Sequence, residues 1–292
     1  MNWDYPGENL DLTETVRLAA SGSFIRLSDG FTHYELAGPP GGQAVVLVHG
    51  FSVPYYIWDP TFLALAQAGL RVLRYDLYGR GYSDRPRAAY GPDLFIRQLL
   101  DLLDGLGLTA PADVVGLSMG GPIAAAFADR HPGRVRRLGL IDPAGMPLRL
   151  PLSARLARLP LVGELALRLV PSQRLVDGLA DDLFSPGSYP EYREKYREQM
   201  RYRGFRRALL STSRSPILEG MAQAYRRVGW QDRRVLLIWG EKDSVLPLAC
   251  SARLRAVVPQ AEYHPIQGTG HIPHYERPEV VNPLLVEFFQ RP

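Results

Sequence analysis

Residues 113–121 have the sequence DVVGLSMGG, and this stretch constrains the fold more than any other part of the chain. Its apolar first half is typical of a buried strand, whereas the small residues of Met119–His131 are typical of a helix. Ser118 lies between the two in a Gly-x-Ser-x-Gly pattern that Gly116 and Gly120 complete. A serine in so sharp a turn has a strained backbone, and side chains two residues away would clash, which explains both glycines. The pattern therefore predicts a nucleophilic serine at the edge of a sheet, rather than a glycine-rich turn with a capping serine.

Strands and helices are predicted to alternate on both sides of this stretch. Ser23–Leu27 and Thr32–Ala37 are two short alternating runs, which predict an antiparallel hairpin. The buried strands are expected at 44–48, 71–76, 113–117, 134–142, 234–240 and 261–266, and the helices at 61–69, 93–107, 119–131, 248–258 and 278–290. Such alternation favours an α/β fold, with a mostly parallel sheet and helices on both faces.

The alternation breaks after the strand that ends at Asp142. Residues 143–227 are rich in Arg and Leu and helical in pattern, without a clear buried strand. We therefore expect a core domain of residues 1–142 and 228–292, with a helical cap domain of residues 143–227 inserted after the sixth strand. The cap should cover Ser118 and influence the choice of substrate.

The leucines of the proposed cap have two interpretations. They offer an apolar surface that could contact an acyl chain, but most of them are expected to form the cap's own core. They are Leu148, Leu150, Leu152, Leu156, Leu159, Leu161, Leu165 and Leu167.

An oxyanion hole is predicted where His49-Gly50-Phe51 follows the strand at 44–48. Gly50 lets the chain turn sharply at the carboxyl edge of the sheet, so the Phe51 amide can face the same point as the Met119 amide. Two such donors stabilise the oxyanion of a tetrahedral intermediate. We therefore expect Phe51 and Met119 to form the hole, and His49 to brace the loop rather than act as a base.

His271 is the best candidate for the base, because it ends the glycine-rich loop that follows the last predicted strand. A loop at that point lies at the carboxyl edge of the sheet, where Ser118 also emerges. His274 is the runner-up and is interpreted as a neighbouring polar residue at the entry to the closing helix. His33 and His131 are expected at the surface.

Asp243 is the expected acid of the site. It follows the strand at 234–240, and its carboxylate could hold the His271 imidazole in the correct tautomer. Asp142 competes for this role, because it ends the preceding strand at the same edge of the sheet.

Six segments, taken in order, resemble the α/β-hydrolase superfamily: VHGFS, RYDLYGRGYSDRP, GLSMGG, LIDPAG, IWGEKDSVLP and GTGHIPHYERPE. They cover nearly all of the chain outside the insertion, and together they are specific for the fold but not for the substrate. The resemblance implies an α/β-hydrolase fold with a cap between the sixth and seventh strands. The chain order Ser118, Asp243, His271 is the order of the triad in this fold. Asp76 and Ser83-Asp84 resemble a structural motif to which no catalytic role is assigned.

Ester hydrolysis is the reaction that these residues favour, and the nearest resemblance is to carboxylesterases and monoacylglycerol-lipase-like serine hydrolases. Ser118 would attack the carbonyl of a small-molecule ester, while Tyr55 and Trp58 would line the pocket. A serine at this position disfavours dehalogenases and epoxide hydrolases, which need an aspartate there to form an alkyl-enzyme ester.

Two alternatives to ester hydrolysis remain. Carbon–carbon bond hydrolases of dienone-type substrates carry a similar Ser-Met-Gly-Gly, but they usually have a glycine-rich HGxGPG loop where this chain has Phe51-Ser52-Val53-Pro54. A small-ligand receptor with a slow triad would have the same site residues, so only turnover distinguishes it.

Composition sets the remaining expectations. The 292 residues have a net charge of +4, and their composition of 46% hydrophobic and 22% charged residues is ordinary for a soluble globular protein. Basic residues cluster in Arg193–Arg214, but Glu194 and Glu198 are interleaved there, which indicates a solvated helix face rather than a nucleic-acid surface. Metal-ligand spacing, a P-loop and a dinucleotide fingerprint are all missing from the sequence, so no metal and no cofactor are expected.

The location in the cell follows from similar arguments. The sequence has no run of about 18 apolar residues, so no membrane span is expected. A single cysteine, Cys250, and the lack of an apolar leader at the N-terminus favour the reducing cytoplasm. The oligomeric state stays open, with a homodimer as one possibility.

Overall fold

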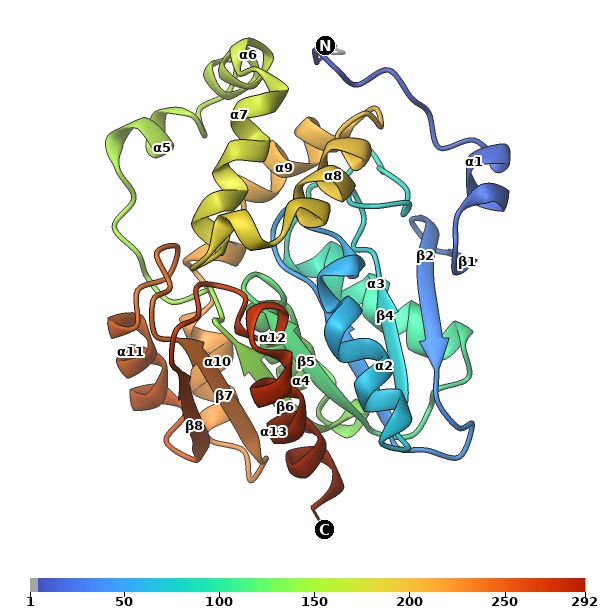
Figure 1. Ribbon diagram of the computed structural model, residues 1–292, viewed down its shortest axis with the longest axis vertical. Coiled ribbons are helices and arrows are strands. Elements are labelled where there is room, and N and C mark those ends of the chain that lie inside the picture. The colour runs from blue at the N-terminus through green and yellow to red at the C-terminus, as the bar shows by residue number, and fades with distance from the viewer. Residues whose placement is uncertain (1–4, 292) are drawn as a thin grey trace.

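The computed structural model describes residues 5–291; residues 1–4 and 292, which belong to the predicted core domain, lie outside the described part. One sheet of eight strands forms the centre of this part (Figure 1). In the spatial order β1-β2-β4-β3-β5-β6-β7-β8, β2 pairs antiparallel with β1 and β4, and the other pairs are parallel. The strands are β1 (Ser23–Leu27), β2 (Gly30–Ala37), β3 (Ala44–Val48), β4 (Arg71–Tyr75), β5 (Ala112–Leu117), β6 (Val135–Ile141), β7 (Val235–Gly240) and β8 (Ala261–Ile266). Every predicted strand is present.

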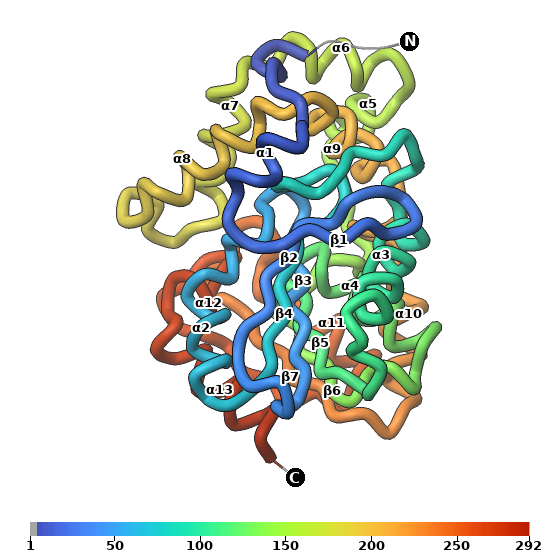
Figure 2. Tube along the Cα trace, turned by 90° about the vertical axis from the view of Figure 1, so that its right-hand side faces the viewer, coloured from blue at the N-terminus to red at the C-terminus, as the bar shows by residue number. Residues whose placement is uncertain are grey.

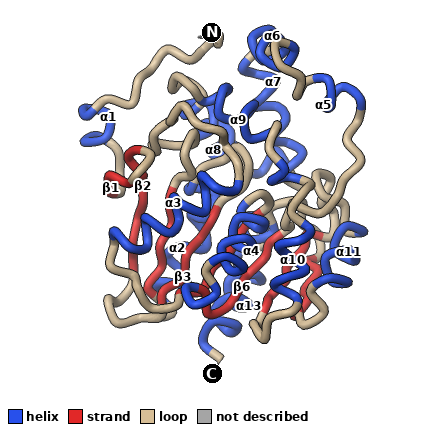
Figure 3. Tube along the Cα trace, turned by 180° about the vertical axis from the view of Figure 1, so that it is seen from behind, coloured by secondary structure: helices blue, strands red, loops and turns tan. Residues whose placement is uncertain are grey.

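Helices cover both faces of this sheet, as Figures 1 and 3 show from opposite sides. One face carries α2 (Asp59–Gln67), α12 (Pro273–Glu276) and α13 (Pro278–Gln290), and the other carries α3 (Pro92–Gly105), α4 (Gly120–Arg130), α10 (Ala222–Gly229) and α11 (Ala249–Val257). The remaining helix of the core is α1 (Glu14–Ala19), before the hairpin, and short 3₁₀ turns lie at Tyr55–Trp58 and Pro132–Arg134.

The apolar sequence of β3 explains how one strand serves two layers. Val46 and Val48 pack into the hydrophobic cluster on the α3 and α4 side. Val45 and Leu47 pack into the cluster on the α2 and α13 side. A strand that is buried on both faces has no polar side to alternate with, which is why the run AVVLV is continuous.

A layer of helices lies over the carboxyl edge of the sheet (Figures 1 and 2). In the sequence, this layer stands between β6 and α10. It contains α5 (Leu152–Leu156), α6 (Val162–Leu169), α7 (Ser172–Asp177), α8 (Pro190–Gln199) and α9 (Phe205–Ser213), with 3₁₀ turns at Gly178–Asp182, Pro186–Ser188 and Pro216–Leu218. The insertion therefore follows the sixth strand, as predicted. The division into a core and a cap domain remains a proposal. Because α10 packs against α4, we propose that the cap ends before Ala222 rather than at Arg227.

The expectation that most cap leucines form a core is wrong. None of the eight is buried, and Leu152, Leu156, Leu159, Leu161 and Leu165 are each at least 46% exposed. Aromatic side chains from α8 and α9 fill the space over the sheet instead, including Tyr192, Tyr196 and Phe205. The short helices α5 and α6 lie outside this cluster, so their leucines face solvent.

Among residues 5–291, no helix is both long and apolar enough to cross a bilayer.

Candidate active site

Ser118 lies at the turn between β5 and α4, in the conformation that the sequence predicts. Its φ is 51°, in the left-handed region that residues with side chains rarely adopt. A Cβ on Gly116 would lie 2.2 Å from the carbonyl oxygen of Gly120, and a Cβ on Gly120 would lie 2.2 Å from that of Val48. Neither contact is physically possible, so any side chain at either glycine would disrupt the turn that holds the serine.

The loop after β3 lies directly against Ser118. A Cβ on Gly50 would approach the Cβ of Ser118 to 3.3 Å. Within residues 5–291, the backbone N–H groups of Phe51 and Met119 donate a hydrogen bond to no protein acceptor. Two unused amides beside a serine match the donor arrangement of an oxyanion hole.

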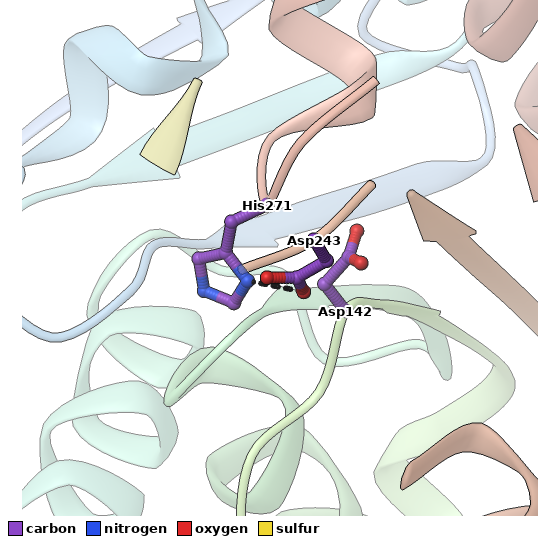
Figure 4. A group of neighbouring side chains, drawn as sticks. All are labelled: Asp142, Asp243 and His271. Carbon is purple, nitrogen blue, oxygen red and sulfur yellow. Dashed lines mark hydrogen bonds and ion pairs between the residues drawn. The ribbon is translucent and has the colours of Figure 1, made fainter. Parts of the chain in front are cut away.

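His271 and Asp243 form a buried pair at the same edge of the sheet (Figure 4). The distance between His271 Nδ1 and Asp243 Oδ2 is 2.7 Å. The other carboxylate oxygen of Asp243 accepts the backbone N–H groups of Val245 and Leu246, each at 2.8 Å. These bonds fix the carboxylate, which in turn fixes the tautomer of the ring with its proton on Nδ1.

The second ring nitrogen of His271 makes no hydrogen bond within the described part of the chain, and the Ser118 hydroxyl is not yet bonded to it. Hydrogen bonds between nucleophile and base are often long in ligand-free structures and shorten when substrate binds. The nitrogen is therefore available to a serine or a substrate.

The pKa of His271 lies above its ordinary value. Burial acts to lower the pKa, but the negative charge of Asp243 and the hydrogen bond to it outweigh burial, and the charge of Asp182 adds to the increase. Because only the neutral imidazole can take a proton, a general base at His271 would lose its function as the pH falls through this raised pKa.

Asp142, the competing acid, lies beside the pair but does not contact the ring through a hydrogen bond (Figure 4). Potential ligand atoms of Asp142, Asp243 and His271 all lie within 4.8 Å of one another, so this is also where a metal ion could be held. Burial, and then the negative charge of Asp243, raises the pKa of Asp142 well above its usual value. A neutral carboxyl is a poor partner for an imidazolium, which favours Asp243 as the acid.

The loop that carries His271 is anchored by two residues that the sequence analysis missed. The backbone N–H of His271 donates to the carbonyl of Asp182 in the cap at 2.8 Å. Glu276 accepts the backbone N–H of Gly270 at 2.6 Å with one oxygen and that of Phe184 at 2.8 Å with the other. Glu276 lies within the segment GTGHIPHYERPE, but only the fold shows that its carboxylate turns back on the loop.

Arg80 is a further residue that the sequence analysis missed. Its buried guanidinium donates to the carbonyls of Phe51 at 2.8 Å and Tyr78 at 3.2 Å, and to the hydroxyl of Thr212 on α9 at 3.0 Å. Gln199 on α8 also donates to this loop, through the carbonyl of Ser52 at 2.9 Å. The loop that carries the Phe51 amide is thus fixed from both the core and the cap.

Three of the other histidines are buried and bonded to other parts of the fold. His49 is fully buried and accepts the backbone N–H of Leu77 at 2.9 Å, so it braces the loop after β4, and burial lowers its pKa to about 4. His274 is also fully buried, bonded to the carbonyl of Ile57 at 3.2 Å, and burial lowers its pKa to about 3. The expectation that His33 is a surface residue is wrong: it is completely buried against Asp76.

The two predicted pocket residues, Tyr55 and Trp58, lie in different surroundings. Tyr55 lines a cavity of about 340 Å³ between the core and α8, which none of Ser118, Asp243 and His271 lines. Its hydroxyl donates to Glu35 at 2.9 Å. Trp58 is fully buried and packs on His274, with 4.4 Å between the ring centroids. Contact of either residue with substrate stays a prediction.

The fold and this site define a class of protein. A family model described as the α/β-hydrolase fold matches residues 43–278, and the chain belongs to this family of hydrolases.

Three individual proteins of known name are similar to this chain in sequence or in structure. The 2-hydroxymuconate semialdehyde hydrolase of Pseudomonas sp. (strain CF600) is 30% identical over 240 residues, which cover 79% of this chain and 81% of that protein. A variant of the meta-cleavage product hydrolase CumD from Pseudomonas fluorescens IP01 matches with a TM-score of 0.78 at 28% identity, over 92% of this chain and 97% of that one. A thermophilic esterase from Thermogutta terrifontis matches with a TM-score of 0.77 at 25% identity, over 93% and 98% of the two chains.

Proposed function

We propose that this hydrolase cleaves a carbon–carbon bond next to a carbonyl group in dienone-type substrates, through an acyl intermediate on Ser118. The observation that carries the proposal is the serine elbow and buried His271–Asp243 pair in a chain similar to two hydrolases named for such products. The sequence alone favours ester hydrolysis, with carbon–carbon bond hydrolysis as the alternative, and the similarities to known hydrolases support that alternative better.

Each step of the proposed reaction has a group in place. His271 takes the proton of Ser118 as its oxygen adds to the carbonyl carbon, and the Phe51 and Met119 amides receive the oxyanion. The bond can break in the keto tautomer of the substrate, in which the departing carbon is saturated and lies beside an enone. When the intermediate collapses, the carbon–carbon bond breaks, its electron pair goes to the departing carbon and spreads over that enone as a dienolate, and His271 returns the proton to this carbon. Water then attacks the acyl-enzyme by the same route. The net change is the addition of water: OH to the acyl carbon and H to the leaving carbon.

Asp243 would hold the His271 ring and stabilise the imidazolium that forms in each half of the cycle. The 2.7 Å bond between the two residues supports this role, as do the two backbone N–H groups that fix the carboxylate. Asp142 would remain neutral and take no part in proton transfer, because burial raises its pKa.

Ester hydrolysis is the second candidate, and one feature of the site favours it. The oxyanion loop has the sequence Phe51-Ser52-Val53-Pro54 in place of the glycine-rich loop that is usual in dienone hydrolases. The likeness to a thermophilic esterase supports the same candidate. The two reactions share the acyl-enzyme and differ in the leaving group, so a single site can be tested for both.

A substrate pair decides between the two candidates. The purified protein is assayed with 2-hydroxymuconate semialdehyde, through its visible absorbance, and with p-nitrophenyl esters of increasing chain length; Ser118→Ala is the control. The proposal expects kcat/KM for the dienone in the range of about 10⁴ M⁻¹ s⁻¹ or more, well above that for any ester. Ester turnover without dienone turnover would contradict it in favour of an esterase. Failure of both would favour a small-ligand receptor.

A further inference from the structure

The helices α5 and α6 and the segment between them expose a set of large apolar side chains, which we name the cap apolar face. Each of them is between 45% and 71% exposed. They are Leu152, Leu156, Leu159, Leu161, Val162, Leu165 and Leu169. Monomeric proteins seldom expose so large a cluster without a partner for it.

The large apolar residues of α6 are spaced so that they lie on one side of the helix. Val162, Leu165 and Leu169 are three and four positions apart, so they share one side of the helix, and that side faces solvent. The opposite side packs on α9 through Gly163, where a Cβ would lie 2.8 Å from Leu210. The helix thus uses its small residue for internal packing and leaves its large residues outside.

Arginines outnumber acidic residues along the segment that carries the cap apolar face. Residues 147–177, up to the end of α7, contain five arginines and two acidic residues, Glu164 and Asp177. Glu164 is paired with Arg214 at 2.6 Å, and Arg158 is paired with Glu219. Within residues 5–291, the other four arginines form no ion pair and are exposed: Arg149, Arg155, Arg168 and Arg174.

The position of this face leaves it accessible. Figures 1 and 2 show α6 at the end of the molecule opposite the C-terminus, with the sheet on the far side of α8 and α9. A flat surface could therefore approach α5 and α6 without contact with the core.

We propose that the cap apolar face docks on the surface of an anionic lipid bilayer. The leucines enter the boundary between headgroups and acyl chains, while the four unpaired arginines bind headgroup phosphates and carboxylates. Apolar and arginine-rich faces side by side are the pattern of helices that lie in the plane of a membrane. A second copy of the chain is a poorer occupant, because a two-fold contact would bring identical arginine clusters together. The proposal does not depend on which bond the enzyme cleaves.

The test is co-sedimentation of the full chain with phosphatidylcholine vesicles, with and without phosphatidylserine. The wild-type protein is expected to sediment with phosphatidylserine vesicles at low salt and to be released by high salt, because surface charges are screened. Binding to phosphatidylcholine alone should be much weaker.

Two double variants separate the charge and apolar contributions. Arg155→Gln with Arg168→Gln should lower the partition coefficient roughly 25-fold, since each arginine near an anionic surface contributes about fivefold. Leu165→Gln with Leu169→Gln should lower it about a hundredfold. Matched controls use exposed residues elsewhere: Arg226→Gln with Arg255→Gln, and Leu18→Gln with Leu63→Gln, which should bind like the wild type.

Three outcomes would overturn the proposal. One is wild-type protein that stays in solution with phosphatidylserine vesicles at low salt. Another is loss of binding in the controls to the same extent as in the cap variants, all of which must melt at the wild-type temperature. The third is a dimer in sedimentation equilibrium that only Leu165→Gln with Leu169→Gln dissociates, which would make the face an interface between copies.

Discussion

Two buried histidine–aspartate pairs lie at the carboxyl edge of the same sheet, and they differ in one contact. His271 Nδ1 lies 2.7 Å from Asp243, and His33 Nδ1 lies 2.8 Å from Asp76. The second nitrogen of His33 bonds to the carbonyl of Ser21 at 2.6 Å. The second nitrogen of His271 has no partner among the described residues. A pair of this kind can move a proton only where one ring nitrogen is left for the reacting groups.

Both carboxylates are fixed by backbone donors, so the difference between the pairs lies in the second ring nitrogen; Asp243 accepts the N–H groups of Val245 and Leu246. Asp76 accepts two backbone N–H groups, from Tyr55 and Tyr82, each at 2.9 Å, and so joins three separate segments of the core. Because both ring nitrogens of His33 face acceptors, the ring must carry both protons. We therefore interpret the His33 pair as a structural ion pair and the His271 pair as the acid–base unit.

The largest expected effect on kcat comes from the same substitution, histidine to glutamine, made separately at His271 and at His33. His271→Gln should lower kcat by about 10⁴-fold or more. His33→Gln should leave kcat within a few-fold, measured where the variant is folded. Loss of turnover in His33→Gln with retention in His271→Gln would invert our interpretation.

Substitution of Asp243 and of Asp142, the two carboxylates beside His271, should also have unequal effects on kcat. Asp243→Asn should lower kcat by about 10⁴-fold, because the amide would hold the His271 ring in the wrong tautomer. Asp142→Asn should cost less than about tenfold, because the neutral acid and the amide are alike in shape and charge. Steady-state kinetics on the same substrate compares the two. If Asp142→Asn is the inactive variant, the acid of the site follows β6 instead of β7.

The sequence was sufficient for the fold and for the residues whose neighbours in the chain reveal them. The glycines beside Ser118 and the strand endings before Asp243 and His271 are local signals, so these positions could be proposed as site residues from the sequence. His33 was misplaced because the pattern of a hairpin says nothing of Asp76, which lies 43 residues away. Asp182, Glu276 and Arg80 act through backbone groups of distant segments, which no local pattern reveals. The exposed cap leucines show the same limit, since a helical pattern does not say which face is covered.

Stability, rather than turnover, is the measurement for the His33 pair. Removing one member of a buried ion pair should cost about 3 kcal/mol in the free energy of unfolding. Burial lowers the pKa of His33, but the hydrogen bond to Asp76 outweighs it, so the pKa is raised. Burial raises the pKa of Asp76, but the hydrogen bond from His33 outweighs it, so that pKa is lowered.

The pH dependence of this stability follows from the two directions. A raised histidine pKa stabilises the fold below its ordinary value of 6.5, and the gain is lost as the pH rises through the folded pKa. A lowered aspartate pKa stabilises the fold above its ordinary value of 3.8, and the gain is lost as the pH falls through the folded pKa. Urea unfolding should therefore show the largest difference between wild type and His33→Gln between these values. A difference that grows toward alkaline pH would contradict the ion pair.

A smaller effect is expected at Asp182. Its negative charge helps to raise the pKa of His271, and burial raises the pKa of Asp182 itself to about 6. Asp182→Asn removes that charge but keeps the backbone carbonyl that binds the His271 N–H. The acidic limb of the kcat/KM profile should therefore move to lower pH, with little change in the plateau. An unchanged limb, or a shift to higher pH, would mean that Asp182 does not act on His271 through its charge.

The most direct test of the central claim, that Ser118 is activated by His271, is covalent labelling with a fluorophosphonate. Such a probe reacts with a serine whose proton a neighbouring base can remove. Peptide mass spectrometry should find the adduct on Ser118 in the wild type and in His33→Gln, and should find no adduct in His271→Gln or Ser118→Ala. An adduct on another serine, or undiminished labelling of Ser118 in His271→Gln, would contradict the account.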